Sequence, residues 1–100
     1  MFIDRRVFRL KPGHMPEVLA LVKANHNQTL QHHSNFKARY MVGLVAGFDM
    51  LVFESEWNNL AEWEQFWPAW AAHPESGLFL QRWAELLDDG GDHQLWRVVE

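Results

Sequence analysis

The side chains best suited to chemistry are a few charged and histidine residues among many aromatic ones. Asp4 and Arg6 stand two residues apart, so on a strand they share one face with Phe8. A partly buried arginine needs an anionic partner, because its guanidinium stays charged at ordinary pH. Two roles follow for Arg6: a structural ion pair with Asp4 or Glu54, or an anchor for the carboxylate, carbonyl or enolate group of a ligand.

Two histidines are candidates for moving a proton. His26 lies on the apolar stripe of a helix predicted over residues 14–32, where it is either a satisfied interior side chain or a proton acceptor in a pocket. His73 precedes Pro74 at a predicted helix junction. It either caps the last carbonyls of the preceding helix or faces a cavity.

The sequence argues against a metal site and against a covalent nucleophile. There is no His-x-x-x-His motif, His32 and His33 point to different helix faces, and His26 and His33 would lie about 10 Å apart along a helix. Cysteine is absent, no serine lies in a Gly-x-Ser-x-Gly turn, and there is no glycine-rich phosphate loop. We therefore expect no metal and no cofactor, and whether the protein is an enzyme stays open.

Tryptophan dominates residues 57–83, which hold five of the six tryptophans. Trp63, Trp67 and Trp70 recur at helical spacing and form one apolar stripe. This stripe is either core and subunit interface, or an aromatic wall for a flat apolar ligand. Trp67, together with Tyr40 on a predicted strand, completes the set of candidate pocket residues.

Periodicity and turn residues predict the order β-α-β-β-α(-α)-β. Strands are predicted over residues 2–10, 36–46, 50–57 and 93–99, with a hairpin connection over 46–49. After the helix of residues 14–32, a second helix is predicted from Asn59, with a kink or break near Trp67 caused by Pro68, and a third over residues 75–87. Residues 88–91, Asp-Asp-Gly-Gly, are predicted to end the third helix.

This order predicts a single α+β domain over residues 1–100, a ferredoxin-like antiparallel sheet with helices on one face. The first strand would pair with the third, which places Arg5, Arg6 and Arg9 beside Glu54 and Glu56. Such pairing accounts for the charge asymmetry: residues 1–50 carry seven Lys/Arg and three Asp/Glu, whereas residues 51–100 carry two and ten.

Composition restricts the class of protein. The net charge is −4 and the basic residues form no dense run, so nucleic-acid binding is not expected. No apolar run approaches the roughly 18 residues of a membrane span, and the N-terminus is not a signal peptide, so we expect a cytoplasmic protein that does not enter a membrane. Six tryptophans exceed what one small core can hide, which favours a subunit contact or a lined cavity.

The chain resembles the NIPSNAP-like families of the dimeric α+β barrel superfamily. The resemblance rests on Leu10-Lys11-Pro12-Gly13 after the first strand, on the strand ending at Trp57 before a helix start, and on His73-Pro74-Glu75 before Phe79-Leu80. It implies a homodimer in which the open sheet faces of two subunits pack into a barrel. It also implies a pocket between the sheet and the helices, but no single function.

The superfamily includes cofactor-free monooxygenases, haem-degrading enzymes and proteins of unknown role. Where NIPSNAP-like proteins have Glu-x-Arg-x-Tyr on the first strand, this chain has Asp4, Arg6 and Phe8, so the tyrosine hydroxyl is lost. Haem-degrading relatives use an asparagine where this chain has Arg6, which argues against haem. We expect a homodimer that binds or turns over a small apolar or aromatic molecule. The alternatives are a cofactor-free monooxygenase of the antibiotic-biosynthesis type and a non-catalytic assembly protein.

Overall fold

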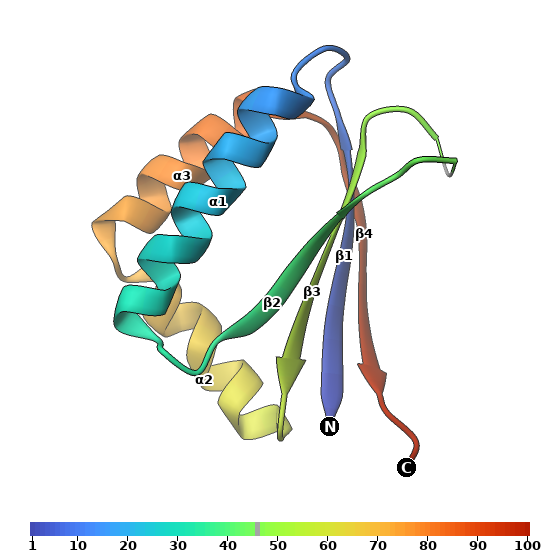
Figure 1. Cartoon of the computed structure of the whole chain (residues 1–100). Helices are drawn as coiled ribbons and strands as arrows, with labels where there is room; N and C mark the ends of the chain where they lie inside the picture. Colours follow the sequence, from blue (N-terminus) through green and yellow to red (C-terminus); the bar gives the residue numbers. More distant parts are fainter. Residues whose placement is uncertain (46) are drawn as a thin grey trace.

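A computed structural model describes residues 1–45 and 47–100 and confirms the predicted fold class. Its elements, in order, are β1 (Phe2–Leu10), α1 (Met15–His32), β2 (Lys37–Val42), β3 (Met50–Trp57), α2 (Leu60–Ala71), α3 (Pro74–Leu86) and β4 (Leu87–Arg97). The helices lie together on one side of a twisted four-stranded sheet, and the two chain ends lie near each other at one end of the sheet (Figure 1).

The sheet is antiparallel with the strand order β2-β3-β1-β4. β1 pairs with β3, as predicted, and the register sets Arg5 opposite Glu54 and Arg6 opposite Phe53. Since neighbours along a strand point to opposite faces, Asp4, Arg6 and Phe8 face the helices, while Arg5 faces away from them. We call these the inner face and the outer face of the sheet.

The hydrophobic core fills one end of the space between the helices and the inner face. Its buried members come from both layers: Leu10, Val18, Val22, Leu51, Trp83 and Leu86. Val18 and Val22 lie four residues apart on α1, so one helical face supplies both of them. Three of these core residues, Val22, Leu51 and Trp83, also line a cavity that extends from the core into the rest of this layer.

The N-terminus of α2 follows the sequence prediction. Of the predicted kink or break near Trp67, the break does not occur. The Asn59 side chain accepts a hydrogen bond of 2.9 Å from the backbone N–H of Glu62, which is a capping arrangement. The helix then continues through Pro68 to Ala71. Pro68 and Glu64 both lie on the exposed side, so the Glu64 carbonyl that proline deprives of a partner can bond water instead.

Two strand boundaries differ from the prediction. β2 ends at Val42 rather than at residue 46. The hairpin connection was predicted over residues 46–49, and its first residue, Ala46, lies outside the described residues. β4 begins at Leu87, because the Asp-Asp-Gly-Gly segment joins the sheet through a register irregularity opposite β1. Gly91 has a φ of 68°, and a Cβ there would overlap the carbonyl oxygen of Val7, so only glycine fits this bulge.

The outer face carries an ion-pair cluster that joins the basic first half of the chain to the acidic second half. Glu54 accepts hydrogen bonds from Arg5 at 2.6 Å and from Arg39 at 2.6 and 2.8 Å. Burial raises the pKa of Glu54, but the hydrogen bonds and charges of Arg39 and Arg5 outweigh it and hold that pKa below its usual value. The predicted alternative in which Glu54 pairs with Arg6 is wrong, because the two side chains lie on opposite faces.

Candidate functional site

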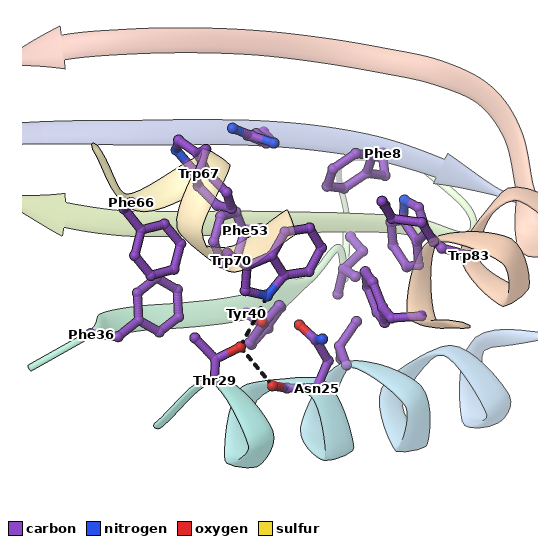
Figure 2. A pocket seen from close by; sticks show the side chains of 15 residues that line it. Phe8, Asn25, Thr29, Phe36, Tyr40, Phe53, Phe66, Trp67, Trp70 and Trp83 are labelled. Carbon is purple, nitrogen blue, oxygen red and sulfur yellow. Dashed lines mark hydrogen bonds between the residues drawn. The ribbon is translucent and has the colours of Figure 1, made fainter. Parts of the chain in front are cut away.

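A cavity of about 160 Å³ lies between the inner face of the sheet and the three helices. Most of its wall is aromatic: Phe8, Phe36, Phe53, Phe66, Trp70 and Trp83. Phe36 and Phe66 stack with ring centroids 4.8 Å apart, and Trp83 meets Phe8 edge to face at 4.9 Å. Figure 2 shows Trp70 between the pair Phe36 and Phe66 on one side and the pair Phe8 and Trp83 on the other. The cavity is therefore a slot with rigid apolar walls.

Two residues that line this cavity each carry a buried N–H donor without a partner among the described residues. The side-chain amide nitrogen of Asn25 and the indole nitrogen of Trp67 are both buried and have no partner among the described residues. Burying such a donor without an acceptor costs about 1–3 kcal/mol. Burial also raises the pKa of Tyr40 to about 12, so its hydroxyl stays protonated at neutral pH and is a third donor. The cavity thus suits a ligand that carries an acceptor oxygen.

Arg6 is held at the cavity by two contacts. Its Nε and Nη2 atoms both donate to the Asp4 carboxylate at 3.1 Å, a bidentate pair. Its guanidinium carbon lies 4.2 Å from the ring centre of Trp67. The Arg6 side chain keeps 27% of its surface exposed, so it combines the two predicted roles: it is paired with Asp4 and it also lines the cavity.

Asp4 lies behind Arg6 and is completely buried. Besides Arg6, it accepts hydrogen bonds from the indole N–H of Trp63 at 2.8 Å and bonds a ring nitrogen of His93 at 3.0 Å. Because its carboxylate oxygens are all engaged, Asp4 has no lone pair directed at the cavity. The role of Asp4 is therefore to position Arg6. Its contacts with Trp63 and His93 could not be predicted from sequence spacing, because both residues are far from Asp4 in the chain.

The helical wall of the cavity is tied together by one hydrogen-bond chain. The indole N–H of Trp70 on α2 donates to the Thr29 hydroxyl at 3.2 Å, and that hydroxyl donates to the backbone carbonyl of Asn25 at 2.8 Å. In Figure 2 Thr29 and Asn25 reach from α1 toward the ring of Trp70. This chain fixes the orientation of Trp70 across the gap between the two helices.

Of the candidate residues, Arg6, Phe8, Tyr40 and Trp67 line the cavity, and the two histidines do not. His26 packs beside Phe36 and Tyr40 and lines a separate open pocket of about 310 Å³ at the edge of β2. The stripe of α1 that faces the cavity runs through Asn25 and Thr29. Hydropathy could not identify Asn25, because a polar residue on a buried stripe has no apolar signal.

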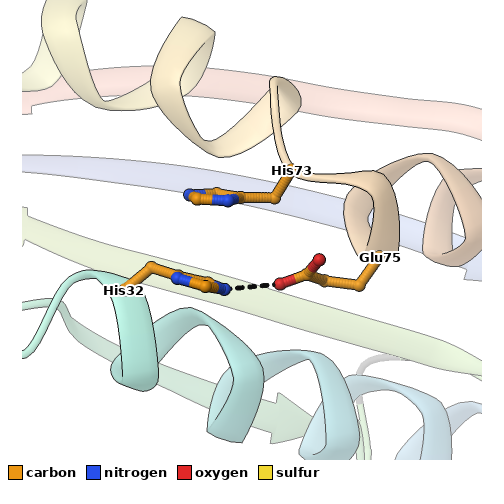
Figure 3. Close-up of side chains that lie close together, drawn as sticks. All are labelled: His32, His73 and Glu75. Atoms are coloured by element: carbon orange, nitrogen blue, oxygen red, sulfur yellow. Dashed lines mark hydrogen bonds and ion pairs between the residues drawn. The ribbon is translucent and has the colours of Figure 1, made fainter.

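His73 begins α3 without capping α2 through its side chain. Its ring instead stacks on that of His32, with centroids 3.9 Å apart, and His32 bonds Glu75 at 2.6 Å (Figure 3). His33 lies beside them, its ring 5.7 Å from that of His73. Burial, followed by the charges of His73 and His32, lowers the pKa of His33. Sequence spacing missed this group, because α1 and α3 bring it together across 43 residues.

Solved structures with this fold include uncharacterized NIPSNAP proteins. A NIPSNAP domain protein from Burkholderia xenovorans superimposes with a TM-score of 0.85 at 16% identity, covering 99% of this chain and 95% of that one. A NIPSNAP family protein from Agrobacterium tumefaciens gives 0.84 at 16% identity, covering 99% and 93%. A putative antibiotic biosynthesis monooxygenase from Chloroflexus aurantiacus gives 0.76 at 11% identity, covering 99% and 93%.

At these identities the similarity establishes the fold, so the expected NIPSNAP-like, ferredoxin-like fold is confirmed. No protein-family model matches the sequence, and no curated protein matches it either. None of the helices in the described part of the chain has both the length and the apolar character needed to cross a membrane. Function must therefore be argued from the cavity itself.

Proposed function

We propose that this protein, which has the NIPSNAP-like fold, binds a small one-ring aromatic molecule that carries an acceptor oxygen. The observation that carries the proposal is the combination of an aromatic slot with unpaired N–H donors on its lining. The ring would pack between the aromatic walls. The oxygen, a phenolate, carboxylate or carbonyl, would accept hydrogen bonds from the donors on the lining.

The cavity volume limits the ligand to about one ring. Engineered cavities of about 150 Å³ in other proteins hold benzene, and this one measures about 160 Å³. A polycyclic ligand would have to project out of the entrance beside Leu80, because the cavity encloses only about one ring. Size therefore supports a monocyclic ligand and disfavours a fused-ring one.

Charge supports a ligand with a negative or strongly polarised oxygen. Arg6 is a permanent cation at the cavity wall, and its Nη1 atom has no hydrogen-bond partner among the described residues. Asp4 already satisfies the other side of the guanidinium. A ligand oxygen can thus be added without breaking the ion pair, and the fixed guanidinium loses little entropy on binding.

The lining favours binding over acid–base catalysis. Its described residues include no histidine, aspartate or glutamate, and Tyr40 is too weak an acid to serve as a base at neutral pH. Cofactor-free oxygenation is the second candidate: an acidic phenol or enol would lose its proton to water before it binds, and Arg6 would stabilise the resulting anion. Oxygen consumption with an acidic one-ring phenol would distinguish oxygenation from binding alone.

We expect phenol and benzoate to raise the melting temperature of the protein more than benzene does, as monitored by tryptophan fluorescence. Leu80 lines the cavity and is 47% exposed, so Leu80→Trp should block the entrance and weaken binding of both ligands by at least about tenfold, or about 1.4 kcal/mol. Leu78→Trp, at a 67% exposed position on the same helix, is the matched control and should leave binding unchanged. Equal affinity in wild type and Leu80→Trp would refute binding in this cavity.

We also propose that two copies of the chain associate through the outer face. The three helices cover only the inner face, and the outer face retains Trp96 at 57% exposure. The β2–β3 connection carries Leu44, Val45 and Phe48, each more than 90% exposed. The apolar residues of this connection are close in sequence and exposed together, as at protein contact surfaces, whereas Trp96 lies on the opposite edge strand. A second copy is the occupant we propose, because Arg5 and Arg39 already pair with Glu54 within the chain, so a contact of this face with itself across a twofold axis would cover paired rather than free charges.

Sedimentation equilibrium is expected to give a dimer at micromolar concentration. Val52 lies at the centre of the outer face on β3, so Val52→Glu should bury a charge in the contact and shift the protein to monomer. Leu78→Glu adds the same charge at an exposed helical position and should leave the dimer intact. A folded monomer in the wild type would rule out the outer-face contact.

A further inference from the structure

The group of His32, His73 and Glu75 lies outside the cavity, at the opposite end of the helical layer from the main core. One potential ligand atom from each residue lies within 4.8 Å of the others. The three residues come from the end of α1, the α2–α3 junction and the first turn of α3. In Figure 3 the two rings lie one above the other, with the Glu75 carboxylate at their edge. We propose that this group binds one divalent transition-metal ion of the zinc type.

The donor set is the first argument. Two imidazoles and one carboxylate are a common set for Zn²⁺, which leaves a fourth position for water. Glu75 supplies an anionic oxygen, and each histidine can supply a neutral ring nitrogen. Magnesium and calcium prefer sites made only of oxygen, so this set selects a transition metal.

Distance is the second argument. In a tetrahedral zinc site with bonds of about 2.0–2.1 Å, neighbouring ligand atoms lie about 3.3 Å apart. The present group is within 4.8 Å, and the nitrogen of His32 is already 2.6 Å from the Glu75 oxygen. Parallel stacked rings cannot both direct lone pairs at one ion, so binding must turn them out of the stack. The His32 and Glu75 side chains are 39% and 28% exposed, which leaves room for that rotation.

The immediate surroundings supply the third argument. The Nε2 atom of His33 is buried beside the group without a hydrogen-bond partner among the described residues. A buried unpaired nitrogen usually marks a missing partner, such as an ion or a water molecule. His33 is not among the three residues whose ligand atoms lie within 4.8 Å of one another, so the role we assign to it is to orient a metal-bound water. A simple ion pair between His32 and Glu75 would account for neither the position of His73 nor the unpaired nitrogen of His33.

The test is calorimetric titration of tag-free full-length protein with zinc chloride. We expect one Zn²⁺ per chain and a rise in melting temperature that EDTA reverses. His73→Ala and Glu75→Gln should each weaken binding by more than about tenfold, because even outer-shell groups are worth about 10–100-fold. His14→Ala is the matched control, since His14 meets Glu17 at 3.1 Å in a comparable exposed pair, and it should bind zinc like the wild type.

Two outcomes would overturn the proposal. If the wild-type protein shows no measurable zinc binding, the group is an ordinary histidine–glutamate ion pair. If the variants bind zinc as tightly as the wild type, the ion binds at a different site. If circular dichroism shows that His73→Ala does not fold, His32→Gln and Glu75→Gln carry the test, since neither alters a fully buried side chain. Failure here would not bear on the ligand cavity, which Leu80→Trp tests separately.

Discussion

Replacing Arg6 by alanine is expected to lower the free energy of unfolding by about 3 kcal/mol, the lower end of the range for breaking a buried ion pair. The substitution leaves the carboxylate of Asp4, which is completely buried, without its charged partner. Trp63 and His93 still bond that carboxylate, which is why the upper end of the range is not expected. Urea denaturation followed by tryptophan fluorescence measures the loss.

Two controls separate the ion pair from other effects of the substitution. Arg9→Ala on the same strand removes an arginine that is 58% exposed and 4.0 Å from its acidic partner, so it should cost less than about 1 kcal/mol. In an Asp4→Asn background, Arg6→Ala should cost much less than in the wild type, because the charge that needs pairing is gone. Equal costs in both backgrounds would show that Arg6 stabilises the protein through packing on Trp67 instead.

Replacing Trp83 by alanine is expected to cost about 3–5 kcal/mol, the usual range for removing a large aromatic side chain from a core. Trp83 is 8% exposed, packs edge to face on Phe8, and stacks on Phe79 with centroids 5.6 Å apart. Because it belongs to both the core and the cavity wall, its removal should also enlarge the cavity. Chemical denaturation of the variant gives the cost.

Added indole provides a direct check of this interpretation. It should occupy the enlarged cavity of Trp83→Ala and raise its melting temperature, with little effect on the wild type. Leu78→Ala on the same helix, at 67% exposure, should change stability by no more than about 0.5 kcal/mol. If indole raised the melting temperature of both proteins equally, the space vacated by Trp83 would not be the binding site.

The sequence contained enough information for the architecture because local signals agreed with each other. The capping arrangement at Asn59, the alternation of β1 and the apolar stripe of α1 each act over a few residues and need no tertiary contact to be recognised. The pairing of Asp4 with Arg6 was predictable for the same reason, since residues two apart on a strand share a face. The predicted break at Pro68 does not occur, and the end of β2 and the start of β4 were wrong, since tertiary packing overrides local preferences there.

The site was less predictable because its decisive contacts are long-range. Trp63 and His93 reach Asp4 across 59 and 89 residues, and the histidine group is assembled from two different helices and a junction. Periodicity placed His26 on the buried side of α1 but could not distinguish the edge of β2 from the cavity. Which side of a helix faces a cavity and which faces a neighbouring strand depends on how the helix packs against the sheet, and periodicity does not contain that information.

The bulge at Gly91 also affects whether other chains can add strands to the free edge of β4. β4 is an edge strand of eleven residues, and a long flat edge is a template on which other chains can add strands. The left-handed turn at Gly91 interrupts the regular row of backbone donors and acceptors, and Asp88, Asp89 and Asp92 place like charges beside it. An incoming copy of the same strand would meet these carboxylates and a backbone out of register. The Asp-Asp-Gly-Gly segment thus protects the sheet from fibrillar growth along this edge.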